Sequence, residues 1–158
     1  MKYLDWNSLG KTFYLLDTYS GLAKEFIKNK NPNKETTNER RLRTGSYVSD
    51  VEIVKRNFSE WENVKVVQGA IPGTLKEITS EKLAYVHIDL NCPEPEVLAA
   101  EYCWPKLVAG GLILLDDYAH LNHDRAKLAM DGFAKEMKTP ILTLPTGQGL
   151  IVKPPVLQ

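Results

Sequence analysis

The sequence predicts an α/β fold, built on an open and mostly parallel sheet with helices on both faces. Apolar runs typical of buried strands alternate along the chain with segments of helical spacing, which indicates parallel strands covered by helices. Near the end of the chain, ILTLP and LIVKP flank TGQG, and this pattern predicts a closing antiparallel hairpin. The chain has 158 residues, 43% of them hydrophobic and 25% charged, and is expected to form one domain over residues 1–158.

The elements follow from local patterns. Strands are expected at four apolar runs, residues 11–18, 64–69, 83–89 and 111–117. Helices are expected at residues 22–30, 49–61, 73–82, 95–107 and 120–137. Ser49 with Glu52 predicts a capping box, Pro105 is expected to end or bend its helix, and residues 30–46 read as a loop. The last helix is expected to have an apolar side formed by Leu121, Leu128, Phe133 and Met137.

The charge pattern argues against nucleic acid and membranes as partners. Twenty basic side chains balance twenty acidic ones, so no overall field attracts a polyanion. The basic run at residues 39–43 is interpreted as part of a solvated loop or lid. The sequence shows no signal-peptide pattern and no apolar window long enough to span a membrane, so a cytoplasmic location is expected.

The two cysteines, Cys92 and Cys103, are expected to be free thiols. A zinc site that joined them to His120 and His123 would contain no CxxC pair, and its spacing matches no common zinc finger. His87 lies within an expected buried strand and is interpreted as a hydrogen-bonded core residue.

Carboxylates end three of the expected strands: Asp17, Asp89, and the pair Asp116 and Asp117. In open α/β sheets, ligands bind at the carboxyl ends of the strands. Any one of these acids could be a helix cap or a turn residue, but several together repel one another unless a cation or a hydrogen-bonding ligand compensates them. Asp17 suits a ribose hydroxyl. The other three suit a hard cation such as Mg²⁺ or Ca²⁺, or a general base.

These residues also carry a resemblance. The segments DTYSGL (17–22), VVQGAIPGTL (66–75), VHIDLN (86–91) and LVAGGLILLDDY (107–118) resemble the macrocin O-methyltransferase family. That family consists of class I enzymes that use S-adenosylmethionine and typically methylate sugar hydroxyls. The resemblance runs from about residue 11 to residue 154 and implies a Rossmann-like fold of the class I methyltransferase type.

The resemblance implies a site. Asp89, Asp116 and Asp117 would bind a divalent metal such as Mg²⁺, and Asp89 would also be the catalytic base and contact the cofactor. The remaining residues expected to bind S-adenosylmethionine are Asp17, Thr18, Gln68, Gly69 and Ala70. The acceptor would be a hydroxyl of a small molecule, such as a sugar or a glycosylated metabolite.

Two features depart from the family pattern. Asn91 stands where the family usually has a second Asp, which keeps an oxygen but removes a charge. The family also begins with a strand and a glycine-rich loop, and nothing before Lys11 matches them. The expectation is an N-terminally truncated sequence, with direct pairing across the gap, or a strand from a partner chain, as alternatives.

The missing loop leaves three classes of function open. The first is a metal-assisted O-methyltransferase. The second is a catalytically inactive relative, either a fragment or an interaction module, that keeps the fold without binding the cofactor. A nicotinamide oxidoreductase ranks last, because it needs the same glycine loop. An uncovered sheet edge would also favour a homo-oligomer.

Overall fold

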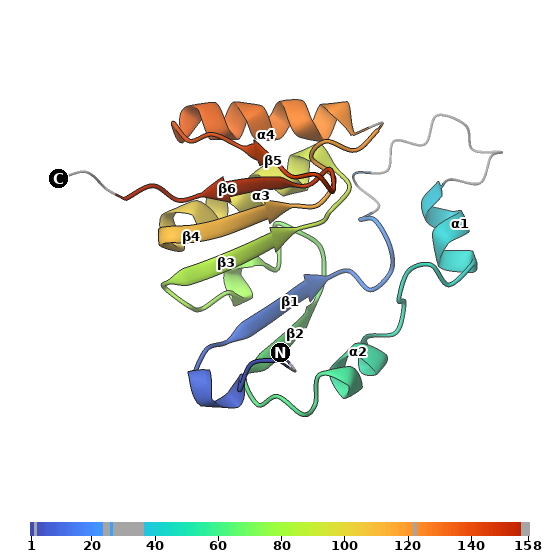
Figure 1. Cartoon of the computed structure of the whole chain (residues 1–158). Coiled ribbons are helices and arrows are strands. Elements are labelled where there is room, and N and C mark those ends of the chain that lie inside the picture. Colours follow the sequence, from blue (N-terminus) through green and yellow to red (C-terminus); the bar gives the residue numbers. More distant parts are fainter. Residues whose placement is uncertain (2, 24–25, 27–36, 122, 156–158) are drawn as a thin grey trace. The chain divides into compact units, whose positions relative to one another are not determined.

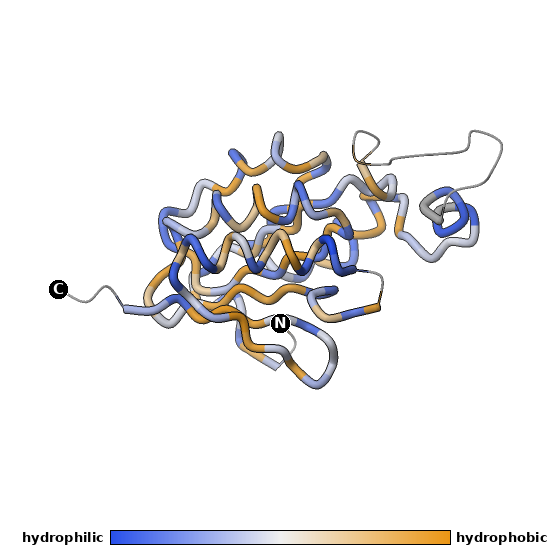
Figure 2. Tube along the Cα trace, turned by 90° about the horizontal axis from the view of Figure 1, so that it is seen from above, coloured by the Kyte–Doolittle hydropathy of each residue, from blue (hydrophilic) through white to orange (hydrophobic). Residues whose placement is uncertain are grey.

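The structure is a computed structural model, and it describes residues 1, 3–23, 26, 37–121 and 123–155. The chain divides into two compact units, Met1–Ile78 and Thr79–Gln158 (Figure 1). Hydrophobic stretches follow the strands, whereas helix α1 (Thr37–Arg43) is mainly hydrophilic (Figure 2). None of the helices in the described part of the chain is long and apolar enough to cross a membrane.

The first unit is built on two parallel strands, β1 (Phe13–Asp17) and β2 (Val64–Gln68). Their register pairs Phe13 with Val64 at one end and Asp17 with Gln68 at the other. Helices α1 and α2 (Val51–Asn57) lie between the two strands in the sequence, and a 3-10 turn (Leu75–Glu77) follows them. This register places the two carboxyl ends side by side.

The second unit contains a four-stranded sheet in the order β3-β4-β6-β5. Strands β3 (Leu83–Ile88) and β4 (Leu107–Leu115) are parallel, and β6 (Gly149–Val152) is antiparallel to both β4 and β5 (Leu142–Thr143). Helix α3 (Pro93–Cys103) packs against β3 and against α4 (Asp124–Glu136) (Figure 1). The predicted α/β class, the parallel pairs and the terminal hairpin are therefore confirmed.

The strands form two sheets rather than one. Strands β1 and β3, on either side of the expected gap, belong to different units, so direct pairing across the gap stays an alternative.

Several element boundaries differ from the prediction. Helix α2 begins at Val51, because Asp50 rather than Ser49 caps it: Asp50 Oδ1 accepts the Glu52 N–H at 2.8 Å. Residues 37–43 form α1 rather than a loop, and only a short 3-10 turn occupies the helix expected at residues 73–82. Most of the helix expected at residues 22–30 lies outside the described residues.

The end of α3 follows the prediction, whereas the start of β4 does not. Helix α3 stops at Cys103, and Pro105 lies in a 3-10 turn directly after it. Proline has no N–H for the helix ladder, so it favours this stop. Strand β4 then begins at Leu107, four residues before the expected start.

The buried side of α4 was predicted correctly at Phe133 and wrongly at Leu121 and Leu128. Leu121 and Leu128 are 90% and 70% exposed. The face that packs inward consists of Ala126, Met130, Phe133 and Ala134. This face packs against α3, where Ala99 and Ala100 are buried. Alanines contribute to the contact on both helices, and a pattern based on large apolar residues does not detect them.

The core of the second unit joins the sheet to this helix pair. Ile113 of β4, Ile151 of β6 and Met130 of α4 are almost fully buried. The Trp104 ring meets the Phe133 ring edge-on, with centroids 5.6 Å apart. Burial of these side chains fixes β4, and with it the residues that follow β4.

We expect Ile113→Ala to lower the free energy of unfolding by about 2–5 kcal/mol, because it leaves a cavity under both neighbouring strands. Urea unfolding followed by circular dichroism measures this change. Leu142→Ala, at a position that is 53% exposed, is the matched control and should shift stability by no more than about 0.5 kcal/mol. Equal losses in the two variants would contradict the assigned core.

Candidate functional site

The first unit gathers predicted cofactor residues at the carboxyl ends of β1 and β2. Asp17 and Gln68 are register partners, and the Gly69 N–H donates to the Asp17 carbonyl at 2.9 Å. Gln68 Nε2 donates to the Thr18 carbonyl at 3.4 Å. Ala70 follows directly in the chain. The five residues expected along the nucleoside are therefore local neighbours within this unit.

One carboxylate oxygen of Asp17 holds the turn after β1, and the other is available to a ligand. Its Oδ1 accepts the Tyr19 N–H at 2.7 Å and the Thr18 hydroxyl at 3.5 Å, which closes the turn after β1. Tyr19 is buried beneath this turn, and burial, followed by the negative charge of Asp17, raises the pKa of its phenol. Asp17 itself is exposed, and its Oδ2 has no partner among the described residues. That oxygen is suited to accept a hydroxyl hydrogen bond.

The second unit brings together the other three predicted acids. Asp89 follows β3, and Asp116 and Asp117 follow β4, which is parallel to β3. The Asp116 N–H donates to the Ile88 carbonyl at 3.0 Å, so the ladder extends to the first acid. All three carboxylates therefore belong to one edge of this sheet. Asp17 and Asp89 lie in different units.

Asp89 is made more basic by its surroundings. Loss of hydration raises the pKa of its carboxyl first, and the negative charges of Asp116 and Asp117 raise it further. His87 and a hydrogen bond from Asn91 Nδ2 to Asp89 Oδ1, at 2.8 Å, act in the opposite direction. Although Asp89 is exposed at the surface, the atoms packed around it remove part of its hydration. A carboxylate of raised pKa is a better proton acceptor near neutral pH.

Asp116 and Asp117 contact donors supplied by the chain. Gln148 Nε2 donates to Asp116 Oδ1 at 2.8 Å, and His87 Nε2 lies 3.5 Å from the same oxygen. His120 Nδ1 and His123 Nδ1 each lie 3.4 Å from an oxygen of Asp117. The expectation that His87 is a core residue is wrong, because its side chain is 43% exposed and faces Asp116.

Sequence reasoning missed a fourth carboxyl, Glu96. It lies in the first turn of α3 and is only 6% exposed. Burial, followed by the negative charge of Asp117, raises its pKa to about 7, while the backbone groups of Cys92 and Asn91 hold it down. Glu96 follows two prolines in PEPE, which reads as an ordinary polar helix start. No signal in the sequence marked it as buried.

The predicted metal site does not find support in this arrangement. Among the side chains that the structure describes, no group of three or more His, Cys, Asp or Glu is gathered closely enough to hold a metal ion. Asp89, Asp116 and Asp117 each have an oxygen directed at a side-chain nitrogen instead. These residues do not fit a metal as they are placed. The zinc set is not gathered either, and Cys92 and Cys103 are free thiols, as expected.

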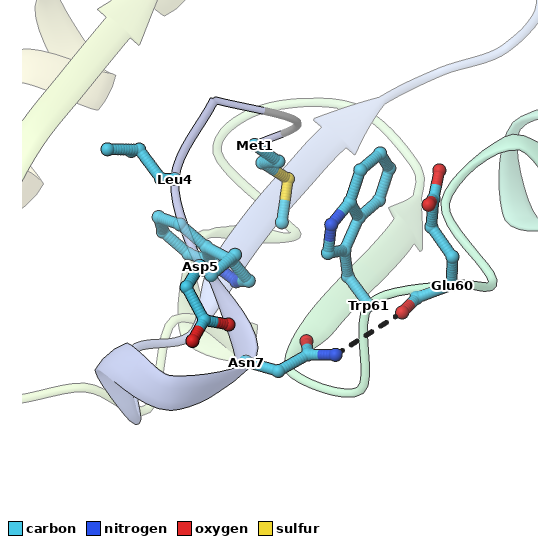
Figure 3. Close-up of a pocket in the computed structure, with 7 residues that line it drawn as sticks. Met1, Leu4, Asp5, Asn7, Glu60 and Trp61 are labelled. Carbon is cyan, nitrogen blue, oxygen red and sulfur yellow. Dashed lines mark hydrogen bonds between the residues drawn. The ribbon is translucent and has the colours of Figure 1, made fainter.

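A separate cavity of about 340 Å³ lies at the other ends of β1 and β2 (Figure 3). Its lining is Met1, Leu4, Asp5, Trp6, Asn7, Glu60 and Trp61. Asn7 closes one side, because its Nδ2 donates to the Glu60 carbonyl at 3.4 Å. The indole N–H of Trp6 is buried without a partner among the described residues. None of these residues belongs to the predicted site, so the cavity is not the place of the expected chemistry.

Comparison with solved structures places this fold in the class I methyltransferase type. The O-methyltransferase NovP matches with a TM-score of 0.72 and 19% identity, over 92% of this chain and 61% of NovP. CalS11, described as a TDP-rhamnose 3'-O-methyltransferase of calicheamicin biosynthesis, matches with a TM-score of 0.55 and 17% identity, over 90% of this chain and 58% of CalS11. A putative caffeoyl-CoA O-methyltransferase from Staphylococcus aureus matches with a TM-score of 0.53 and 14% identity, over 65% of this chain and 59% of that one.

The family model for macrocin O-methyltransferase (TylF) matches residues 3–146, which is most of the chain. The chain therefore belongs to the macrocin O-methyltransferase family, as its motifs predicted. It spans about three fifths of the length of NovP and CalS11. No curated protein matches the sequence.

We expect Glu96→Gln to make stability less dependent on pH. Below a pH of about 4.5, the ordinary pKa of a glutamate, the Glu96 carboxyl is mostly protonated in both the folded and the unfolded state. As the pH rises towards the raised pKa of about 7, only the unfolded state ionises, so the wild type loses stability over this range. The variant should be more stable than the wild type at pH 8 by up to about 3 kcal/mol, with little difference at pH 4.5.

Urea unfolding at both pH values measures this difference. Glu101→Gln, at an exposed position of the same helix, is the control and should follow the wild type. Parallel pH profiles for the wild type and Glu96→Gln would contradict the burial of the Glu96 carboxyl.

Proposed function

We propose that the chain is the catalytic part of an S-adenosylmethionine-dependent O-methyltransferase. The acceptor proposed is a hydroxyl of a small molecule, such as a sugar or a glycosylated metabolite. The observation that carries the proposal is Asp89: in a member of this family, a carboxyl of raised pKa lies beside two further carboxylates at the carboxyl edge of parallel strands. The description of CalS11 as a methyltransferase of a sugar nucleotide supports the choice of acceptor.

The predicted cofactor residues of the first unit bind the nucleoside in this proposal. Asp17 accepts a ribose hydroxyl at its Oδ2, and Gln68, Gly69 and Ala70 line the nucleoside beside it. When bound, the cofactor supplies a methyl group on a positively charged sulfur, and S-adenosylhomocysteine is the product left behind.

Asp89 acts on the acceptor. Its carboxylate takes the proton of the acceptor hydroxyl as the oxygen forms its bond to the methyl carbon and the carbon–sulfur bond breaks. Most of the rate would come from holding the oxygen in line with the methyl group, at about 3 Å. A base of raised pKa supplies the remainder.

Assistance by Mg²⁺ stays a prediction of the family resemblance, and the mechanism proposed here contains no step that depends on it. A catalytically inactive relative is the second candidate. The observation that favours it is that side chains of the chain itself, Gln148, His120 and His123, occupy oxygens of Asp116 and Asp117. Binding of the cofactor product separates the two candidates.

We expect S-adenosylhomocysteine to bind the purified chain with micromolar affinity, and Asp17→Ala to weaken this binding at least tenfold, because it removes a charged acceptor. Isothermal titration calorimetry, with and without MgCl₂, measures the affinity. Glu62→Ala, at an exposed acid of the same unit, is the control and should bind as the wild type does. No heat of binding from a folded wild type would favour the inactive relative, and an effect of MgCl₂ would support the metal prediction.

We expect Asp89→Asn to lower kcat by about 100-fold or more, because the amide cannot accept the proton. Methyl transfer to a panel of sugar nucleotides and glycosides, followed by mass spectrometry, measures the rate. Glu101→Gln serves again as the control. Unchanged turnover in Asp89→Asn would mean that Asp89 is not the base. The assignment of the cofactor would still hold.

A further inference from the structure

The TGQG turn, residues 146–149, leads from β5 into the first residue of β6 and lies against the segment that follows β4. The Ala119 N–H donates to the Gly147 carbonyl at 2.7 Å. His120 Nε2 lies 3.1 Å from the Thr146 carbonyl. The turn is therefore joined to the segment after β4 by a backbone hydrogen bond and by a side-chain contact. It belongs to the same edge of the sheet as Asp116 and Asp117.

Two glycines allow this close contact. A Cβ at Gly147 would lie 2.5 Å from His120 Cδ2, and a Cβ at Gly149 would lie 2.6 Å from Tyr118 Cγ. Gly147 also has a φ of +86°, which side-chain-bearing residues rarely adopt. Gly147 and Gly149 therefore allow the turn to lie close to the segment that carries Asp116 and Asp117.

Gln148 uses this position to hold Asp116. Its Nε2 donates to Asp116 Oδ1 at 2.8 Å, and its Oε1 accepts the Thr146 hydroxyl at 2.9 Å. A carboxylate can only accept, so the amide must turn its nitrogen towards Asp116. The Thr146 hydroxyl then satisfies the oxygen at the other end. Both ends of the amide are occupied, and its orientation is fixed.

The position of Asp116 among other acids explains why the orientation of its carboxylate must be fixed. Asp116 lies at the same strand edge as Asp89, because β3 and β4 are parallel and the Asp116 N–H donates to the Ile88 carbonyl at 3.0 Å. A mutually repelling carboxylate that can rotate freely would move away from its neighbours. A donor fixed from the opposite side keeps it in place.

We propose that the Thr146–Gly149 turn is a positioning element of the active site, in which Gln148 fixes the carboxylate of Asp116 and Thr146 fixes Gln148. The family match ends at residue 146, so it does not extend to Gln148. The catalytic part of this inference rests on the proposed function, whereas the contact itself does not.

The contact is tested first by NMR, without any turnover. The side-chain amide signal of Gln148 is assigned by its disappearance in Gln148→Ala. In the wild type, one of its two protons should be shifted downfield by the bond to a carboxylate, and Asp116→Ala should reverse this shift. Asp124→Ala, which replaces an acid at the start of α4, is the control and should leave the signal unchanged. The same chemical shift of the Gln148 amide in the wild type and in Asp116→Ala would overturn the proposal.

The catalytic consequence is tested by kinetics on the same variants. Gln148→Ala should lower kcat about tenfold, the effect expected from one hydrogen bond to a charged group, while the affinity for S-adenosylhomocysteine changes less than twofold. Thr146→Val should lower kcat about threefold, and Thr146→Ser, which keeps the hydroxyl, should restore it. An active wild type with unchanged kcat in Gln148→Ala overturns the positioning role, as does an equal loss of affinity and kcat.

The NMR, binding and kinetic experiments test the two proposals separately. A wild type that neither binds the cofactor product nor transfers a methyl group defeats the proposed function, and the NMR experiment still decides whether Gln148 holds Asp116. An active wild type whose Gln148 signal does not depend on Asp116 defeats the positioning role alone.

Discussion

Repulsion among carboxyl groups is the constraint on which the second unit depends. Asp89, Asp116 and Asp117 converge where β3 and β4 end, and Glu96 is close enough for the charges of Asp117 and Asp89 to raise its pKa. Water would normally screen such charges, but burial removes part of it. The fold responds in two ways: nitrogen atoms of nearby side chains face the three aspartates, and the raised pKa of Glu96, about 7, leaves its carboxyl partly protonated near neutral pH.

A polar network behind the acidic segment anchors it to α4. Tyr118, directly after Asp117, donates to Asp131 at 2.5 Å, and Lys127 Nζ lies 2.6 Å from the other oxygen of Asp131. The Lys127 ammonium also lies 4.6 Å from the centre of the Tyr118 ring. Because Tyr118 is buried and paired, the chain after β4 leaves the strand in one direction. The TGQG turn holds this segment from the hairpin side and the network holds it from the helix side, so the acids lie on a fixed segment.

The sequence correctly predicted that Asp17, Asp89, Asp116 and Asp117 lie at strand ends, because each one ends an apolar run and strand ends are among the clearest local signals. It failed where the answer depended on packing between distant segments. Glu96 looks like a helix-start acid until Pro95 and Ala99 beside it are seen to be buried against the rest of the unit. Gln148 looks like a turn residue until the hairpin folds back on Asp116. Leu128 looks like a core residue and is exposed, because the face of α4 that packs inward carries Met130, Phe133 and two alanines instead.

Asn91, where the family resemblance would place an aspartate, acts on the same repulsion. A carboxylate there would add a further negative charge to the crowded edge, two residues from Asp89. The amide instead donates to Asp89 Oδ1 at 2.8 Å, and this bond lowers the pKa that the other acids raise. Asn91 adopts a φ of +56°, a left-handed conformation that asparagine tolerates better than most residues. The substitution therefore supplies a donor in a permitted conformation, and it moderates the basicity of Asp89 while keeping it above that of an ordinary carboxylate.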